Sequence, residues 1–393
     1  MKHKVLILGT LGEFTELVKK AKEKGYETVV CDGYADGIAR TYADKAYTIP
    51  VTDVDAIALM CREEGVDGII TSFSDLLLEC MVKIADKAGL PCYLKPEQLP
   101  WYRDKSETRA LLRKLELPTP GFRKIPTAVL EDPDRKSRLK ERLKGLRYPV
   151  VSKPLDKYGS RGIYISENLD ELIEASQKTA EFSDMPEILV EEYNDGYEFN
   201  MMTWVLDGQV HVISIADREK TSVAKGEIPI STRNVYPSRL MAKVERPATE
   251  LLQAYIEKTG QKDGALSMQF FWKPGEGIQV CEIAARFFGY EHELTDIVYG
   301  FNMEELLLAS LYDRTKLQKM LTDHDIHKPH CCGAVIYFQG RLLTIGDQSK
   351  AVLLGQKKEV EKPWIFYREG ETVIEHGPNP YLALYYVKTE NRE

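Results

Sequence analysis

The 393-residue sequence lacks any apolar run that approaches the ~18 residues needed to cross a membrane. The run near the start, Val5 to Leu8, stops at Gly9. It is shorter than the apolar core of a secretory signal, and it suits a first buried strand. Low-complexity tracts and internal repeats are absent from the sequence as well. We therefore expect a cytoplasmic protein with no membrane partner.

Cysteine is present, but never in a metal-binding spacing. The seven cysteines are scattered and include no Cys-x-x-Cys motif, so the sequence gives no support for a zinc site. Basic residues are also outnumbered, because 53 Lys and Arg against 61 Asp and Glu give a net charge of −8. This balance argues against a broad nucleic-acid surface, although it is compatible with a local cationic site.

A complete dinucleotide-binding fingerprint is missing too. Gly9-Thr-Leu-Gly12 lacks the Gly-x-Gly-x-x-Gly spacing, so we do not expect a nicotinamide or flavin site. Around it, residues 1–95 alternate short apolar runs with helical patterns, which predicts a doubly wound parallel α/β sheet. Ligands of such sheets bind beyond the carboxyl ends of the strands. Asp32 lies at one such end, where a ligand contact and a turn role explain it equally well.

Residues 148–165 combine two β-branched segments with a glycine-rich loop, which predicts strand, loop and strand. Lys153 lies near the end of the first strand. Glycine backbones can turn their N–H groups towards an anion, and the loop also carries basic and hydroxyl side chains. The loop therefore suits a polyphosphate, with Lys153 reaching in from the strand. A surface hairpin with a basic tip explains the same residues.

A second charged element is a predicted hairpin that closes at Lys273 and Ile278. This closure would set Gln269 opposite Glu282 across the ladder. Because side chains alternate along a strand, Glu282 and Arg286 would share one face. Charges on a buried face are costly without partners. A metal-bound polyphosphate or a mutual ion pair would each supply them.

Three further polar features lie near these elements. Ser106 is predicted to cap a helix that follows Lys105, and the polar segment 217–236 is predicted to be a loop near the site. Arg218, Arg233 and His292 are expected in loops that face the site. Such an arginine could bind a carboxylate and such a histidine could act as a base, whereas a solvated surface position explains each equally well.

Taken in chain order, these motifs resemble the ATP-grasp ligases, a superfamily that includes biotin carboxylase and the large subunit of carbamoyl phosphate synthetase. The resemblance covers about residues 1–330. Five stretches carry it: Asp104-Lys105 before a helix and Leu-Pro-Thr-Pro, Tyr-Pro-Val-Val-Ser-Lys153-Pro, the loop from Asp156 to Gly162, the stretch from Leu189 to Glu198, and Val280-Cys-Glu-Ile-Ala-Ala-Arg286.

The resemblance implies an α/β architecture, with α+β character in the ATP-grasp part. We expect four parts: a pre-ATP-grasp Rossmann-like domain over residues 1–100, the ATP-grasp lid over 101–192, the ATP-grasp core with the metal and phosphate site over 193–330, and a small β-rich C-terminal appendage over 331–393.

The resemblance also implies roles for individual residues. Those expected to bind ATP are Lys105, Lys153, Lys157, Tyr158, Gly159, Ser160, Gly162, Glu191, Glu192, Tyr193 and Glu198. Within this set, the two lysines Lys105 and Lys153 would hold phosphates. Glu191 and the backbone of Glu192 and Tyr193 would meet the adenine edge, and Glu198 would bind the ribose.

The catalytic residues implied by the resemblance are Lys153, Glu282 and Arg286, and the magnesium or manganese ligands are Gln269 and Glu282. Two positions depart from the family pattern. The family usually places an acid where Gln269 stands, and often an asparagine where Ala284 stands. Gln269 still offers a carbonyl oxygen to a hard cation, and waters with phosphate oxygens can complete the coordination sphere. Ala284 offers no ligand.

The implied function is an ADP-forming carbon–nitrogen ligase. It would use ATP to activate a small carboxylate, such as an amino acid, as an acyl phosphate for attack by an amine. Partners would be small-molecule carboxylates and amines, with no nucleic acid, and a homodimer is the candidate assembly. One alternative is an ATP-binding sensor or assembly protein with a degenerate metal site. Another is a bicarbonate-using carboxylase of the purine-pathway type, although its His-Asn-Ser-Gly-His stretch is replaced here by residues 287–292.

Overall fold

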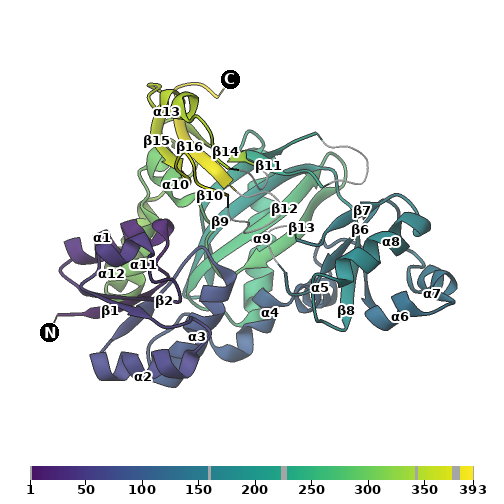
Figure 1. Cartoon of the computed structure of the whole chain (residues 1–393), viewed down its shortest axis with the longest axis horizontal. Coiled ribbons are helices and arrows are strands. Elements are labelled where there is room, and N and C mark those ends of the chain that lie inside the picture. Colours follow the sequence, from purple (N-terminus) through teal and green to yellow (C-terminus); the bar gives the residue numbers. More distant parts are fainter. Residues whose placement is uncertain (1, 158–160, 223–227, 341–343, 374–380, 393) are drawn as a thin grey trace.

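A four-stranded parallel sheet in the order β3-β2-β1-β4 forms the N-terminal part of the computed structural model (Figure 1). The structure describes residues 2–157, 161–222, 228–340, 344–373 and 381–392. The elements of this part are β1 (Lys4–Leu8), η1 (Gly12–Phe14), α1 (Thr15–Glu23), β2 (Glu27–Asp32), η2 (Ile38–Thr41), β3 (Lys45–Thr48), α2 (Val54–Glu64), β4 (Gly68–Ile70), α3 (Asp75–Ala88) and η3 (Pro96–Gln98). The predicted alternation of strand and helix is confirmed.

The lid is a second four-stranded sheet, in the order β5-β8-β6-β7, with helices packed on it. It follows the helices α4 (Pro100–Arg103) and α5 (Lys105–Lys114). Its elements are β5 (Phe122–Pro126), α6 (Thr127–Glu131), α7 (Arg135–Arg142), β6 (Val150–Pro154), β7 (Tyr164–Ser166), α8 (Leu169–Ala180) and β8 (Glu187–Glu192). The antiparallel pair β6 and β7 is the predicted strand–loop–strand unit.

An eight-stranded sheet in the order β13-β12-β9-β10-β11-β14-β16-β15 forms the centre of the molecule. Its strands and the neighbouring helices are β9 (Tyr197–Leu206), β10 (Gln209–Lys220), β11 (Ser231–Tyr236), α9 (Met241–Thr259), β12 (Gly264–Lys273), β13 (Gly277–Ala284), α10 (His292–Tyr299), α11 (Met303–Tyr312), α12 (Arg314–Asp323), β14 (Cys332–Gln339), α13 (Ser349–Gly355), β15 (Val360–Ile365) and β16 (Tyr381–Thr389). The C-terminal part is β-rich as expected, and β14, β16 and β15 extend the central sheet.

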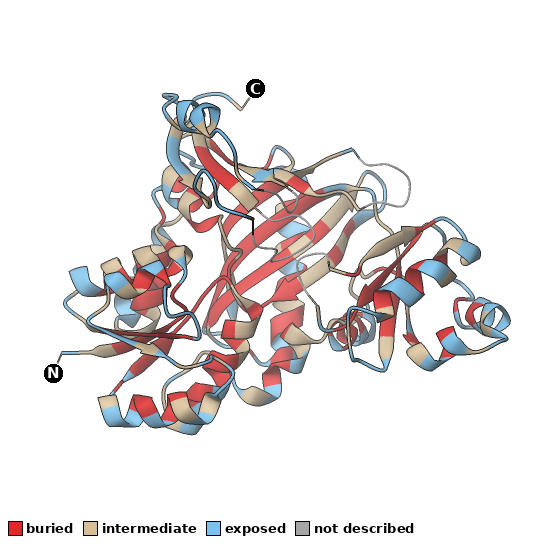
Figure 2. Cartoon of the chain, viewed as in Figure 1, coloured by how far each residue is buried: buried red, intermediate tan, exposed pale blue. Residues whose placement is uncertain are grey.

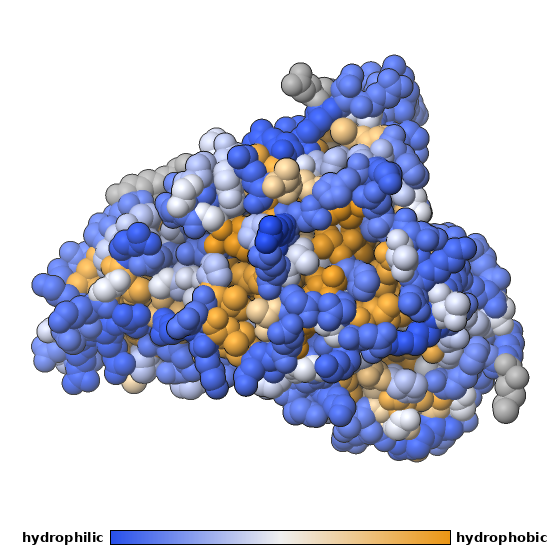
Figure 3. Space-filling view, turned by 180° about the vertical axis from the view of Figure 1, so that it is seen from behind, coloured by the Kyte–Doolittle hydropathy of each residue, from blue (hydrophilic) through white to orange (hydrophobic). Residues whose placement is uncertain are grey.

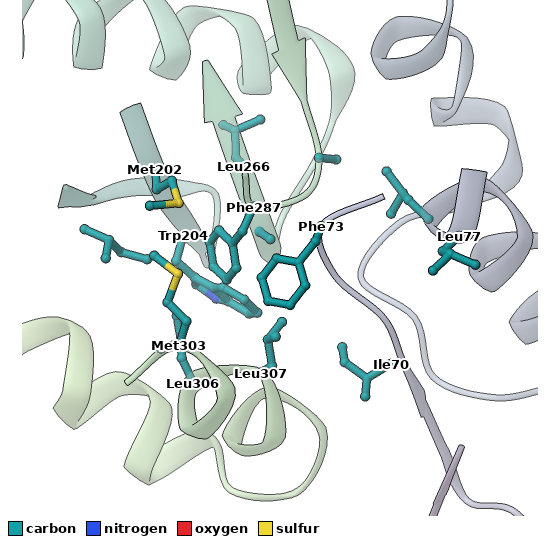
Figure 4. Close-up of a cluster of buried hydrophobic side chains, with 14 of the residues drawn as sticks. Ile70, Phe73, Leu77, Met202, Trp204, Leu266, Phe287, Met303, Leu306 and Leu307 are labelled. Carbon is teal, nitrogen blue, oxygen red and sulfur yellow. The ribbon is translucent and has the colours of Figure 1, made fainter. Parts of the chain in front are cut away.

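The buried apolar side chains form a large core, shared by the N-terminal part and the central sheet, and a separate core in the lid. The central strands and the strands β1, β2 and β4 of the N-terminal sheet are buried along most of their length, whereas the edge strand β3 is mostly exposed (Figure 2). Figure 4 shows where they join: Ile70, Phe73 and Leu77 of the N-terminal part meet Trp204 of β9, Phe287, and leucines of α11 in one apolar cluster. The lid has a separate cluster of its own, around Val150 and Ile188. The N-terminal part and the central sheet therefore share a core, and the lid is the part that can move without opening it.

The outer surfaces are polar. In Figure 3 the flanks of the molecule are mostly hydrophilic, and apolar side chains gather over the middle of the face that is seen. No helix in the described ranges is long and apolar enough to cross a membrane.

Two local predictions are wrong. The segment 217–236 is not a loop throughout, because β10 runs on to Lys220 and β11 begins at Ser231, so residues 217–220 and 231–236 lie on paired strands. The many polar and few apolar residues of the segment hid these strand ends. The helix after Lys105 is capped by Asp104, whose side chain accepts hydrogen bonds from the N–H groups of Ser106 and Glu107. Asp104 thus replaces Ser106 as the N-cap.

Candidate active site

Lys153 lies on β6 and is held by a buried cluster of charges. Its Nζ pairs with Glu191 of β8, which is the neighbouring strand. The same carboxylate accepts a hydrogen bond of 2.5 Å from Nε of Arg109 on α5. Burial would raise the pKa of Glu191, but Arg109 and Lys153 hold it at about 2. The cluster therefore keeps Glu191 ionised and fixes the direction of Lys153.

The Arg109 guanidinium links this cluster to the central sheet. Its Nη2 donates a hydrogen bond of 2.6 Å to the carbonyl of Cys281 on β13. Arg109 and Glu191 are each about 2% exposed, so neither has much contact with solvent. Sequence analysis expected Glu191 at the adenine edge, and the structure shows its carboxylate turned to these cations. Arg109 was missed, although it follows Lys105 by four residues on the same helical face.

Lys105 begins α5 and lies in a pocket between the lid and the central sheet. The pocket is lined by Asp75, Arg103, Lys105, Thr108, Arg109, Asp156, Lys157, Cys281 and Glu282, among others. Nζ of Lys105 donates a hydrogen bond of 2.6 Å to the carbonyl of Lys157, which belongs to the loop after β6. Burial lowers the pKa of Lys105, and the Glu282 carboxylate opposes this effect. The pocket thus brings Lys105 of α5 and Lys157 of the lid close to Glu282 of β13.

Glu198 lines a second pocket, which has a volume of about 770 Å³. Tyr193 and Lys220 line the same pocket. The buried carboxylate of Glu198 accepts hydrogen bonds from Arg218 at 2.6 Å and from Gln269, and pairs with Lys220 at 2.6 Å. Burial would raise the pKa of Glu198, and Arg218 and Lys220 lower it. The acid is therefore ionised and oriented by two cations that lie on β10.

Gln269 and Glu282 are cross-strand partners on β12 and β13, as predicted. The hairpin closes one residue earlier than expected, with Lys273 opposite Gly277, and a register shift between Gln269 and Phe270 restores the predicted pair. A β-bulge of this kind commonly re-aims a side chain beside an active site. Because the amide nitrogen of Gln269 is tied to Glu198, its oxygen is the atom left for a ligand.

The donor set around this pair fits a hard divalent cation in part. Glu282 and Gln269 offer oxygen atoms, which Mg²⁺ prefers, and both side chains are only partly buried. Within the described part of the chain, no group of three His, Cys, Asp or Glu side chains could hold a metal by itself. These two residues therefore suit a metal ion that arrives with most of its ligands supplied by a nucleotide.

Arg286 follows β13 and lies against the N-terminal part with 11% of its side chain exposed. Its Nη2 donates a hydrogen bond of 2.6 Å to Asp75, the first residue of α3, and its Nη1 reaches the carbonyl of Phe287 at 3.2 Å. Although burial opposes it, the Asp75 carboxylate raises the pKa of Arg286. Nε of Arg286 is buried without a protein partner among the described residues. Asp75 was missed by sequence analysis, because 211 residues separate it from Arg286.

Among the other predicted nucleotide residues, Lys157 lines the first pocket and Tyr193 the second. Gly162 has a positive φ of 68° beside Phe182, and Lys157 lies on the loop beside Asp156. The N–H groups of Glu192 and Tyr193 donate to the carbonyls of Gly121 and Pro149. The Glu192 carboxylate pairs with Arg147 at 3.0 Å. Tyr158, Gly159 and Ser160 lie outside the described residues.

The three residues expected in loops lie on regular elements. Arg218 is on β10 and pairs with Glu198, whereas Arg233 is on β11 and pairs with Glu219 at 2.6 Å. His292 begins α10 and is buried between Glu293 and Glu304, at 2.9 Å and 2.5 Å. Burial opposes the shift, but both carboxylates raise the pKa of His292 well above its usual range. The positive charge of the protonated His292 is therefore balanced by these two carboxylates.

Comparisons with known proteins agree with this geometry. Residues 146–293 match the family model of the ATP-grasp domain. The fold of the whole chain is similar to three solved structures: L-amino acid ligase from Bacillus licheniformis (19% identity, TM-score 0.79, covering 100% of this chain and 94% of that chain), phosphoribosylglycinamide synthetase from Anaerococcus prevotii (20%, 0.73, 100% and 95%) and N5-carboxyaminoimidazole ribonucleotide synthetase from Thermotoga maritima (16%, 0.70, 100% and 94%). The chain therefore carries an ATP-grasp domain and has the overall fold of the ATP-grasp ligases.

Proposed function

We propose that this protein is an ADP-forming ligase, which activates a small carboxylate with ATP and joins it to an amine. The observation that carries the proposal is the pocket where Lys105 of α5, Lys157 of the lid and Glu282 of β13 meet. Asp75, the partner of Arg286, lines the same pocket. Lys105 and Lys157 come from two parts of the chain and lie in one pocket with Glu282, and cations beside an acid suit the phosphates of a nucleotide with its metal.

The chain's own residues would act mainly by positioning and by neutralising charge. Lys105 and Lys153 would bind the α- and β-phosphates of ATP. Arg286, with a free Nε and a fixed partner in Asp75, would stabilise the γ-phosphoryl group as it passes to the carboxylate. The lid would close over the nucleotide and exclude water, which otherwise hydrolyses an acyl phosphate. The separate core of the lid supports such a movement.

Magnesium or manganese would be held by Glu282 and by the carbonyl oxygen of Gln269. When bound, such an ion neutralises phosphate charge during transfer. Tyr193 and Glu198 line the pocket of about 770 Å³ that we assign to the nucleoside. Glu191 is better explained as the partner of Lys153 than as an adenine contact, because both of its oxygens already accept from cations.

The solved structures that resemble this chain have different activities, and each supports a different choice of substrates. The L-amino acid ligase supports amino acids as carboxylate and amine, and we adopt this version. The sensor alternative is favoured by Gln269 and Ala284, which leave one protein carboxylate for the metal. A bicarbonate-using carboxylase is supported only by fold similarity to the purine-pathway synthetase.

The test is ADP release across the L-amino acids, singly and in pairs, with Mg²⁺ or Mn²⁺. The proposal predicts release that depends on an amino acid and increases with a second amine. ATP binding without turnover for every acid would favour the sensor. Release that needs bicarbonate and no amino acid would favour the carboxylase.

A further inference from the structure

Glu13 is an acid of the N-terminal part that approaches the segment following β13. It lies in η1, directly after β1, at the carboxyl edge of the parallel sheet where ligands of such sheets bind. Its Oε1 lies 2.7 Å from the point where a Cβ on Gly289 would be. Gly289 follows Arg286 by three residues. The absence of a side chain at Gly289 therefore makes room for this carboxylate beside the proposed phosphoryl clamp.

The groups around Glu13 come from two parts of the chain, residues 286–293 and the strand β16. Arg286, His292 and Glu293 act on it electrostatically, and Tyr290 forms a backbone hydrogen bond with it. Two aromatic groups of the C-terminal strand β16, Tyr381 and Tyr386, also lie within its electrostatic reach. His292 and Glu293 are already paired, with Glu304 and Lys362 as their further partners. Glu13 itself forms no ion pair with any described residue.

The chemistry of the second half-reaction needs such a group. An amine that attacks an acyl phosphate must lose a proton as the new bond forms. The other acids of the site are committed: Glu191 and Glu198 are ionised by paired cations, and Glu282 is assigned to the metal. Glu13 is a nearby acid that pairs with no cation among the described residues. Burial raises the pKa of Glu13 to about 7, which matches a base that works near neutral pH.

We propose that Glu13 binds the attacking amine and is its general base, an inference that rests on the proposed ligase function. The amine nitrogen forms a bond to the acyl carbon, and the bond between that carbon and the phosphate oxygen breaks. Inorganic phosphate leaves with the electron pair, and the proton of the amine passes to the Glu13 carboxylate.

The surroundings also indicate the kind of amine. Tyr290 packs edge-to-face with Trp364, Phe366 and Tyr381, with ring centroids 5.6 to 5.8 Å apart. All four rings remain partly exposed, and Trp364 lies against Gly12, the residue before Glu13. Aromatic faces bind apolar groups and attract a nearby ammonium ion. The amine therefore carries an apolar side chain, such as that of phenylalanine or leucine.

The experiment compares two ways of consuming the acyl phosphate. Hydroxylamine is largely unprotonated at neutral pH and is reactive enough that water can take up the proton it loses, so hydroxamate formation reports the first half-reaction alone. We expect Glu13→Gln to keep hydroxamate formation within about threefold of the parent and to lower amide formation with L-phenylalanine by about 100-fold or more. Glu13→Asp should recover part of the amide rate. Glu16→Gln, an exposed acid three residues further on, is the matched control and should change neither rate.

The outcomes separate this inference from the function on which it rests. If Glu13→Gln forms amide at the parent rate, or loses hydroxamate and amide equally while remaining folded, Glu13 is not the base. A parent enzyme that prefers glycine or glutamate to phenylalanine and leucine as the amine would overturn the apolar amine site. A parent enzyme that forms no hydroxamate with any amino acid would overturn the ligase function itself, and the role of Glu13 with it.

Discussion

The side of the site proposed for the nucleotide and the side proposed for the acceptor are built in different ways. On the nucleotide side, Lys153 and Glu191 lie on adjacent lid strands, and Gln269 and Glu282 lie opposite each other in one hairpin. On the acceptor side, Arg286 is held by Asp75 from far away in the chain, and Glu13 approaches from a third segment. The nucleotide side is therefore a product of local strand pairing. The acceptor side exists only once the N-terminal part is packed against the central sheet.

This difference explains how the two sides can vary independently. Strand pairing sets Gln269 opposite Glu282 and puts Lys153 on the strand next to that of Glu191. The acceptor side depends on the apolar junction of Figure 4, where Phe73 lies two residues before Asp75. Phe73 has a φ of 70° and stacks on His292, with ring centroids 4.4 Å apart. Strained backbone of this kind persists when the surroundings determine it, and here it places the start of α3 at the site.

The largest effect is expected on the nucleotide side. We expect Lys153→Ala and Glu282→Ala each to lower ADP formation by about 1000-fold, because each removes a charge that acts on the phosphates. Lys124→Ala is the control, since Lys124 forms an exposed ion pair with Glu187 on the same sheet. Circular dichroism should show intact folds. ADP release by either site variant at the parent rate would refute the assignment.

A smaller effect is expected when the acceptor side is disturbed alone. Asp75→Asn leaves Arg286 in place but weakens its orientation, and we expect kcat to fall roughly 10- to 100-fold, because small misplacements of a clamp are costly. The KM for ATP should stay within about threefold of the parent. Steady-state kinetics with ATP varied separately from the acid would measure both. A rise in the KM for ATP with unchanged kcat would place Asp75 on the nucleotide side instead.

The sequence predicted most of the nucleotide side and little of the acceptor side. The strands around Lys153 and the Gln269–Glu282 pair could be predicted, because side chains alternate and short motifs order them. The approach of Asp75 and Glu13 could not be predicted, because it depends on how two distant sheets pack. Arg218 illustrates an intermediate case: its charge was noticed, but its strand was mistaken for a loop because the segment 217–236 is rich in polar residues.

The pH dependence of amide formation and of hydroxamate formation should distinguish the acceptor side from the nucleotide side. Only the ionised form of Glu13 can accept a proton, and burial raises the pKa of Glu13 to about 7. Amide formation should therefore fall about tenfold for each pH unit below 7, whereas hydroxamate formation should not follow this limb. Glu13→Gln should lose the difference between the two profiles. Parallel profiles in the parent would contradict a base on the acceptor side.

The smallest effect is expected at Gln269. Gln269→Glu adds a carboxylate to the metal ligands, but it also replaces the amide that donates to Glu198 with a like charge. We expect the Mg²⁺ concentration for half-maximal ADP release to fall by less than about tenfold. A titration of Mg²⁺ at saturating ATP would measure it. Turnover that appears only in this variant would favour the sensor alternative for the parent.

The transfer of phosphate to a carboxylate is tested most directly with oxygen-18. An amino acid that supports turnover is labelled in both carboxylate oxygens, and the released phosphate is analysed by mass spectrometry. An acyl phosphate requires one labelled oxygen to pass from the carboxylate to each phosphate released, and this is the result that we predict. Unlabelled phosphate would show that ATP is hydrolysed by water and would contradict the ligase mechanism.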